Sequence, residues 1–271
     1  MNEKKMDALT YADSRLATTA DTTADTQAVA LKVHCRPARL TDAQTCAALI
    51  FESGVKEFSF FLGVPEAECV AFLRVAFASG HGRFSWRRHH VATAADGTVL
   101  AVMAVHDGRS TWFDDPHVAW MIVRHFGFAR TIPILLRGLT LESELPAPKR
   151  SQSLIAHCAT HESTRGNGVF SALFGYALGA GLLNPGPGRA LVLDVLKSNE
   201  RARGLYERLG FVALPRARKQ SRRLPAALDS VRMRFEHSLQ AHFAPLARTC
   251  MTHQFAARDT TGTATLSTSV H

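Results

Sequence analysis

The sequence predicts an α/β domain, a sheet whose strands alternate along the chain with helices. The first indication is an apolar run at 154–160 that leads into the glycine-rich stretch Thr-Arg-Gly-Asn-Gly-Val-Phe (164–170) and then continues with helical spacing. The second is a shorter apolar run at 190–195, followed by a helix around Tyr206 that ends at Gly210. Strand, turn and helix in this order favour a sheet covered by helices.

The N-terminal elements follow from local signals. Residues 31–35 alternate as a strand does, and an Arg-Pro pair ends them. A Thr-Asp pair starts a helix at 41–53, because short polar side chains cap helix N-termini. Glycine ends that helix, and we interpret 54–64 as a loop that carries three phenylalanines. A proline in its first turn starts the next helix, 65–79.

The middle of the chain combines a hairpin with helical segments. The apolar runs 86–94 and 99–106 are joined by Ala-Asp-Gly, which is typical of a hairpin turn. Residues 117–145 show helical spacing and are interpreted as two helices split near Pro133. A short linker then leads into the strand 153–160.

The C-terminal elements are shorter. The helix after the glycine-rich stretch is expected at 168–183, and Asn-Pro-Gly-Pro-Gly (184–188) is a loop. Strands are expected at 190–195, from Phe211, and at 231–236, and the Tyr206 helix lies between the first two.

Composition sets the domain limits. The chain has 271 residues, but its ends are rich in Thr, Ser, Ala, Asp and Gly with little apolar periodicity. Such segments bury too little apolar surface to offset the entropy lost on ordering. We therefore expect a disordered tail at 1–30, one domain at 31–240 and a flexible tail at 241–271.

Three observations favour a cytoplasmic location. The most apolar long stretch, 117–141, is interrupted by arginines and a histidine, so no transmembrane segment is expected. The N-terminus lacks the apolar core of a secretory signal. The five cysteines show no paired spacing, which predicts reduced thiols and neither a disulfide framework nor a zinc site.

The net charge of +9 is partly concentrated at 216–223, where five residues are Arg or Lys. A basic cluster can bind nucleic acid or an acidic partner. Here no aromatic residues are interleaved with the charges, so we favour a solvated loop and consider nucleic-acid binding unlikely. A retardation assay without salt-sensitive binding would remove that alternative.

The glycine-rich stretch is a candidate phosphate site. The first amides of a helix have no partner within it, and the helix dipole adds partial positive charge there. Gly166 and Gly168 let the main chain approach an anion closely. We call residues 165–170 the cradle.

Two motifs together resemble those of the GNAT superfamily of acyl-CoA N-acyltransferases. The first is Arg-Gly-Asn-Gly-Val-Phe in the cradle, with Phe170 where the family usually has a small residue. The second, Asn-x-x-Ala-x-x-x-Tyr-x-x-x-Gly-Phe, runs from Asn199 to Phe211. The resemblance implies a splayed mixed sheet flanked by helices, and it makes the helical segment at about 117–145 an insertion.

The resemblance also implies a site for acetyl-CoA as cosubstrate, without a metal. Pantetheine would pair with the strand before the cradle, and the pyrophosphate would rest on the cradle amides. The residues implied in cofactor binding are Cys158, Ala159, Thr160, Arg165, Gly166, Asn167, Gly168, Val169, Phe170 and Asn199. Asn199 has a second interpretation, as the cap of its own helix.

The chemistry implied is direct attack of an amine on the thioester. Tyr206 stands at the family position that protonates the leaving thiolate, although a packing role is the alternative. Family members with a clear base carry Glu or His at positions that are Ala156 and Leu154 here. His157 is one residue away, so strand alternation turns it to the other face unless a bulge intervenes. The base is left unassigned, and water is one possible proton carrier.

The favoured function is therefore an N-acetyltransferase acting on an amine, with a small molecule as the first acceptor class and a protein amine as the second. The rival is a non-catalytic acyl-CoA-binding regulator on the same fold, motivated by the missing base. The inserted helices at 117–145 suit a pocket cover, a homodimer contact or a membrane surface, and the sequence leaves these open.

Overall fold

The computed structural model describes residues 32–110, 114–183, 185, 188–216, 222–236 and 250–251. In these ranges the strands form one mixed sheet of eight, in the order β6-β7-β5-β4-β3-β2-β1-β8. The strands are β1 (Val33–Pro37), β2 (His89–Thr93), β3 (Val99–Asp107), β4 (Gln152–Thr160), β5 (Ala190–Leu196), β6 (Phe211–Ala213), β7 (Ser230–Phe235) and β8 (Cys250–Met251). The α-helices are α1 (Ala43–Ser53), α2 (Val55–Leu62), α3 (Glu66–Ala78), α4 (Asp114–Glu142), α5 (Val169–Gly179) and α6 (Glu200–Arg208). The predicted α/β class is confirmed.

The connections explain the mixed sheet. Strands β1 to β4 pair antiparallel in chain order, and the β2–β3 turn is the predicted hairpin. Gly97 adopts a φ of 88° there, and its N–H donates to the Ala94 carbonyl at 3.0 Å. Strand β5 joins β4 in parallel after the α5 crossover, and β7 and β6 add antiparallel strands beyond it.

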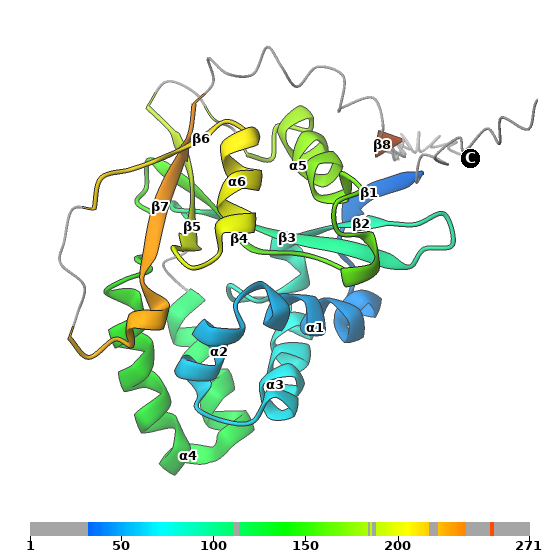
Figure 1. Ribbon diagram of the computed structural model, residues 1–271. Coiled ribbons are helices and arrows are strands. Elements are labelled where there is room, and N and C mark those ends of the chain that lie inside the picture. The colour runs from blue at the N-terminus through cyan, green and yellow to red at the C-terminus, as the bar shows by residue number, and fades with distance from the viewer. Residues whose placement is uncertain are drawn as a thin grey trace, which may run out of the picture. The chain divides into compact units, whose positions relative to one another are not determined.

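Helices cover both faces of the sheet, as Figure 1 shows, with α5 and α6 on one face and α1 to α4 on the other. Each face has its own buried cluster. One includes Leu173, Tyr206 and Phe211, and the other includes Phe72 and Phe77. We call these the cofactor-side core and the helical-side core.

The expected loop at 54–64 is wrong, because most of it is the helix α2. Glycines stand at both ends of this helix, and Gly63 caps it with a φ of 65°. Phe58 and Leu62, four residues apart, bury one face against the helical-side core. This amphipathic turn is too short for its period to be clear in the sequence.

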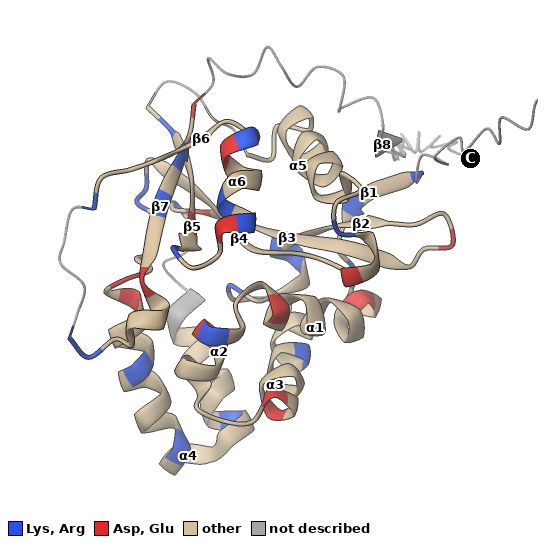
Figure 2. Ribbon diagram, viewed as in Figure 1, with Lys and Arg blue, Asp and Glu red and all other residues tan. Residues whose placement is uncertain are grey.

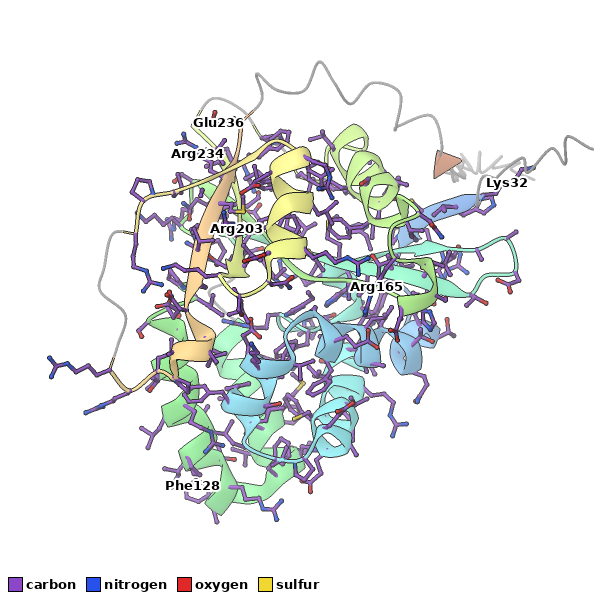
Figure 3. The ribbon with its side chains drawn as sticks, viewed as in Figure 1. Lys32, Phe128, Arg165, Arg203, Arg234 and Glu236 are labelled. Atoms are coloured by element: carbon purple, nitrogen blue, oxygen red, sulfur yellow. The ribbon has the colours of Figure 1, made fainter. Side chains whose placement is uncertain are left out.

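The expected helical insertion is present as α4, but its break lies at Gly127 and not near Pro133. Gly127 takes a φ of 77°, which favours glycine, whereas Pro133 lies inside the second helical part. Exposed apolar side chains line α4, among them Trp120, Phe128, Leu136 and Leu139, with a few basic residues between them in Figure 2. Figure 3 shows Phe128 pointing away from the domain. Phe128 is 74% exposed. No helix within the described residues is long and apolar enough to cross a bilayer.

Two further expectations concern the cysteines and the chain ends. Cys35 is disulfide-bonded, so the expectation of reduced thiols is wrong at this position. Cys46, Cys69 and Cys158 are free thiols. Strand β8 pairs in parallel with β1. The rest of the predicted tails, 1–30, 241–249 and 252–271, lies outside the described residues.

Arg137 joins α4 to α2. Its guanidinium donates to the carbonyls of Phe61 and Leu62, at 3.0 and 2.6 Å. Both carbonyls lie at the end of α2, where helical partners are missing.

We expect Arg137→Ala to lower the free energy of unfolding by about 2 kcal/mol, because charged hydrogen bonds to a helix end are lost. Arg130→Ala is the matched control on the same helix, since its pair with Glu68 is long, at 3.4 Å, and exposed. Urea denaturation of both variants measures the difference. Equal losses would show that the Arg137 contact contributes no more than a surface ion pair.

Candidate active site

A gap opens between β4 and β5, because their pairing stops part-way. The parallel register runs from Gln152 opposite Ala190 to Ile155 opposite Leu193, and β5 then continues only along β7. The main chain of 156–160 therefore has no strand partner on its β5 side within the described residues. This is the splay that the sequence resemblance implies, and it is suited to an added extended chain.

Strand β4 contains a bulge at the start of this gap. Ala104 pairs with Ala156 and Val102 pairs with Ala159, so that Met103 alone lies opposite His157 and Cys158. His157 has a φ of 53°, the one positive value at a non-glycine residue in the described ranges. A bulge inverts the alternation of the side chains beyond it.

The bulge decides which faces the two side chains meet. His157 turns to the helical-side core, where its ring lies 5.2 Å from that of Phe84 and 6.1 Å from that of Phe58. Cys158 packs on the cofactor-side core instead. The sequence alone expected His157 on the other face unless a bulge intervened. The bulge is present, and His157 lies on the helical side.

The cradle is open. Gly166 and Gly168 have φ values of 92° and 74°, and a Cβ added at either would meet no atom within 4 Å. The Arg165 and Asn167 amides donate within the turn, to the carbonyls of Glu162 and Thr164. No described backbone group accepts from the amides of Gly166 and Gly168, or from those of 169–170, which lie at the start of α5. An anion fits these amides.

Arg165 makes two contacts next to the end of β4. Its Nε donates to the Thr160 carbonyl at 3.0 Å, and its guanidinium pairs with Glu52 of α1 at 2.8 Å. Figure 3 shows Arg165 where the chain passes from β4 to α5, above α1. The predicted cofactor-binding arginine therefore also fixes the end of β4.

Tyr206 and Cys158 lie side by side at the gap. The Tyr206 hydroxyl forms a hydrogen bond with the Cys158 thiol. Cys158 donates its own proton towards the Ala156 carbonyl, so Tyr206 is the donor in the pair. Burial raises the pKa of Tyr206 well above its ordinary value and that of Cys158 to about 12. Both groups are protonated at neutral pH, and Cys158 is no nucleophile.

Phe170, the departure from the family pattern, does not fill the cradle. Its side chain is 7% exposed and meets the Tyr206 ring edge-on at 6.2 Å. A bulky residue at this position therefore supports Tyr206 from α5.

Two interpretations were given for Asn199, and the structure shows it as the cap of its own helix. Its side chain accepts a hydrogen bond from the Ala202 amide at 3.1 Å, at the start of α6. Nearby, Lys56 of α2 reaches Ser198 at 3.4 Å. The helical side and the β5–α6 loop thus meet beside the gap.

Sequence reasoning missed a cluster of histidines on three neighbouring strands. His89 of β2 hydrogen-bonds His157 of β4 between Nε2 and Nδ1, at 3.0 Å, and the planes of the two rings are only 10° apart. His106 of β3 meets His157 edge-on at 5.6 Å. The signal was available only as histidines on three successive strands, two on β2 and one each on β3 and β4, and no local motif joins them.

The cluster is uncharged at neutral pH. Burial lowers the pKa of His89 to about 4 and the pKa values of His106 and His157 well below the ordinary range. His89, His106 and Arg83 add to the effect on His157. Among the described residues no three His, Cys, Asp or Glu side chains are arranged to hold a metal ion.

Comparison with known families identifies the chain. Residues 70–211, more than half of it, match the model of the Acetyltransferase (GNAT) family. The chain belongs to the GNAT acetyltransferase family. The splayed sheet and the two predicted motifs are thus those of a GNAT domain, and the fold expected from them is confirmed.

Solved structures agree on the GNAT fold. One acetyltransferase is 20% identical with a TM-score of 0.51, over 74% of this chain and 98% of that chain. An N-acetyltransferase from Staphylococcus aureus Mu50 is 16% identical with a TM-score of 0.55, over the same 74% and 98%. Likeness at such identities concerns the fold. A comparison with curated proteins finds no match.

Buried histidines predict acid sensitivity of this GNAT domain. The pKa values of His89 and His90 fall from 6.5 to about 4 on folding, so the unfolded chain binds more protons between those values. The stability is complete above pH 6.5 and is lost as the pH falls towards 4. We expect each of these two histidines to remove about 2 kcal/mol from the free energy of unfolding by pH 5.

Urea denaturation at pH 7 and pH 5 measures this loss, and His90→Gln should reduce it by one histidine's share. A free energy of unfolding that is unchanged between the two pH values would contradict the buried, neutral state of these imidazoles.

Proposed function

We propose that this chain is an N-acetyltransferase that moves acetyl from acetyl-CoA to an amine by direct attack in a ternary complex. The observation that carries the proposal is the Tyr206 hydroxyl beside the segment 156–160, which has no described strand partner on its β5 side and leads to an open cradle. Family membership supports acyl transfer as the reaction class. Fold alone does not name the acceptor.

Acetyl-CoA supplies the activated acetyl group as a thioester, and this chain supplies its binding surface. The pantetheine would lie along 156–160, and the pyrophosphate would meet the amides of Gly166, Gly168 and 169–170. The thioester would then come to the bulge, where we propose that a main-chain N–H near Cys158 binds the developing oxyanion. This arrangement holds both reactants for attack without a covalent enzyme intermediate.

Tyr206 is proposed as the proton donor to the leaving thiolate. It is 8% exposed, and its hydroxyl already donates to a sulfur atom, that of Cys158. A thiolate leaving at the same place would accept the same hydrogen bond. The Phe170 ring packs edge-on against the Tyr206 ring.

For the acceptor we propose a small-molecule amine first and a protein amine second. Helix α2 and its contact at Lys56–Ser198 narrow the helical side of the gap, which favours a compact acceptor. The basic cluster at 216–223 lends little support to an acidic macromolecule, because Arg216 pairs with Glu144 and Asp229. Positions 217–221 lie outside the described residues.

The rival, a non-catalytic acyl-CoA-binding regulator, predicts tight cofactor binding without turnover. Release of free CoA with any member of a broad amine panel decides against it. Binding alone does not separate the two, so the binding test below is paired with a kinetic one.

We expect Gly168→Glu to weaken acetyl-CoA binding at least about 10-fold, because a side chain and a negative charge enter the anion site. Gly97→Glu is the matched control: its φ is 88° against 74° at Gly168, and added side chains meet open space at both. The two variants carry the same charge and similar backbone strain. Calorimetric titration with acetyl-CoA compares them, and equal affinities would remove the cradle as the cofactor site.

We expect Tyr206→Phe to lower kcat by roughly 10²-fold with an unchanged Kd for acetyl-CoA, since only the proton donor is lost. Tyr176→Phe on α5 is the control. Steady-state release of CoA and titration of each variant give the two constants. A kcat within about two-fold of the parent would assign Tyr206 to packing.

A further inference from the structure

We propose that His157 takes the proton of the attacking amine at its Nε2, that His89 fixes its tautomer, and that the site favours an amine that enters uncharged, such as an aromatic amine. This inference rests on the proposed acetyl transfer and names its base and acceptor class. It is carried by the β4 bulge and by the hydrogen bonds that lead from Ser85 to His157.

The Ser85 carbonyl determines the tautomers of His89 and His157. The Ser85 carbonyl can only accept, so His89 must donate to it from Nδ1, at 2.8 Å. Nε2 of neutral His89 is then a lone pair, and it accepts from Nδ1 of His157 at 3.0 Å. The proton on Nδ1 leaves Nε2 of His157 as the basic atom. No described residue donates a hydrogen bond to that Nε2.

The bulge places this atom on the acceptor side of the thioester. His157 and Cys158 are successive residues whose side chains lie on opposite faces of β4. Tyr206 contacts Cys158 on one face, where the thiolate would leave, and His157 faces α2 on the other, where the amine would enter. His157 is half-buried, whereas His89 is fully buried. His157 is therefore the less buried residue of the two.

The charges around the cluster disfavour an ammonium ion. The groups that act on His157 are His89 from β2, His106 from β3 and Arg83 from the segment before β2. Arg88 acts on His106 in addition. The remaining neighbours on the helical side are the rings of Phe58 and Phe84. None of the described groups that act on His157 is a carboxylate. The carboxyl of Glu57 on α2 has a buried Oε2 without a hydrogen-bond partner among the described residues, and burial raises its pKa, which disfavours the charged form that could balance a cation.

An aromatic amine suits this surface better than an alkyl amine does. It is uncharged at neutral pH, and its ring can pack beside Phe58 and Phe84. A neutral nitrogen also demands only a weak base. Its proton becomes acidic as the new bond to carbon forms, when an imidazole of low pKa can accept it.

The step balances without a further reactant. The amine nitrogen attacks the thioester carbon, a C–N bond forms, and the C–S bond breaks with its electron pair on sulfur. The N–H proton moves to Nε2 of His157, and the sulfur takes a proton from the Tyr206 hydroxyl. The imidazolium then releases its proton, and the phenolate regains one, through solvent.

The test uses the full chain and follows CoA release with 4-methylaniline and benzylamine, which differ in charge at pH 7.5. His157→Asn removes the base with a residue that tolerates a positive φ. We expect it to lower kcat for the aniline at least about 10²-fold with an unchanged Kd for acetyl-CoA. His90→Gln is the control, since His90 is a buried histidine on β2 next to His89 but faces Tyr176 on the cofactor side.

His89→Phe tests the positioning role, because it keeps a ring in the stack but cannot accept from Nδ1 of His157. We expect a smaller loss of kcat and a displaced acidic limb of the pH profile. Imidazole ¹⁵N shifts of the parent protein provide a readout that needs no substrate. Both histidines should be Nδ1–H tautomers at pH 7.

The outcomes are distinct. Turnover of the aniline that survives His157→Asn within about three-fold, a preference for benzylamine at pH 7.5, or an Nε2–H tautomer of His157 would overturn this inference and leave the acetyltransferase proposal standing. Acetyl-CoA binding with no turnover of any amine by the parent protein would overturn both.

Discussion

The site depends on the backbone of β4 at a single point. Up to Ile155 the strand pairs on both sides, with β3 and β5, and beyond it only β3 remains a partner. The bulge at His157 and Cys158 begins where that second partner is lost. A positive φ at a histidine costs on the order of 1–3 kcal/mol, so the surrounding packing must hold it. Two stacked rings, Phe84 and His89, provide that support.

This one distortion distributes the proposed proton donor and the proposed base over two faces of the sheet. The cofactor side receives Cys158, and through it the Tyr206 hydroxyl that Phe170 supports. The helical side receives His157 and its partners on β2 and β3. In a regular strand the two side chains would exchange faces, because alternation would be kept. His157 would then lie on the α5 side and Cys158 on the α2 side.

Much of the fold was predictable because its signals are local. One or two residues are enough to predict the backbone at several places. Examples are the hairpin at Asp96-Gly97, the proline before α3 and the glycines of the cradle. The errors arose where the local signal was short or where two signals competed. Helix α2 is only two turns long, and the break in α4 was assigned to Pro133 although a glycine six residues earlier carries it.

The candidate site divides in the same way. The cradle, Asn199 and Tyr206 are motif residues and were predictable by position. The histidine cluster was not, because its members come together only through strand register, and the face of His157 depends on a bulge that no residue type announces. Phe170 departs from the family pattern, and only the packing of α5 shows that its ring lies against that of Tyr206.

The central claim is that acetyl-CoA occupies the gap beside β4 and ends on the cradle. Amide hydrogen exchange, with and without saturating acetyl-CoA, tests it most directly. We expect slower exchange in two segments, 156–160 and 166–170, with little change in the β2–β3 hairpin. Exchange that is unchanged in both segments at a saturating concentration would contradict the account.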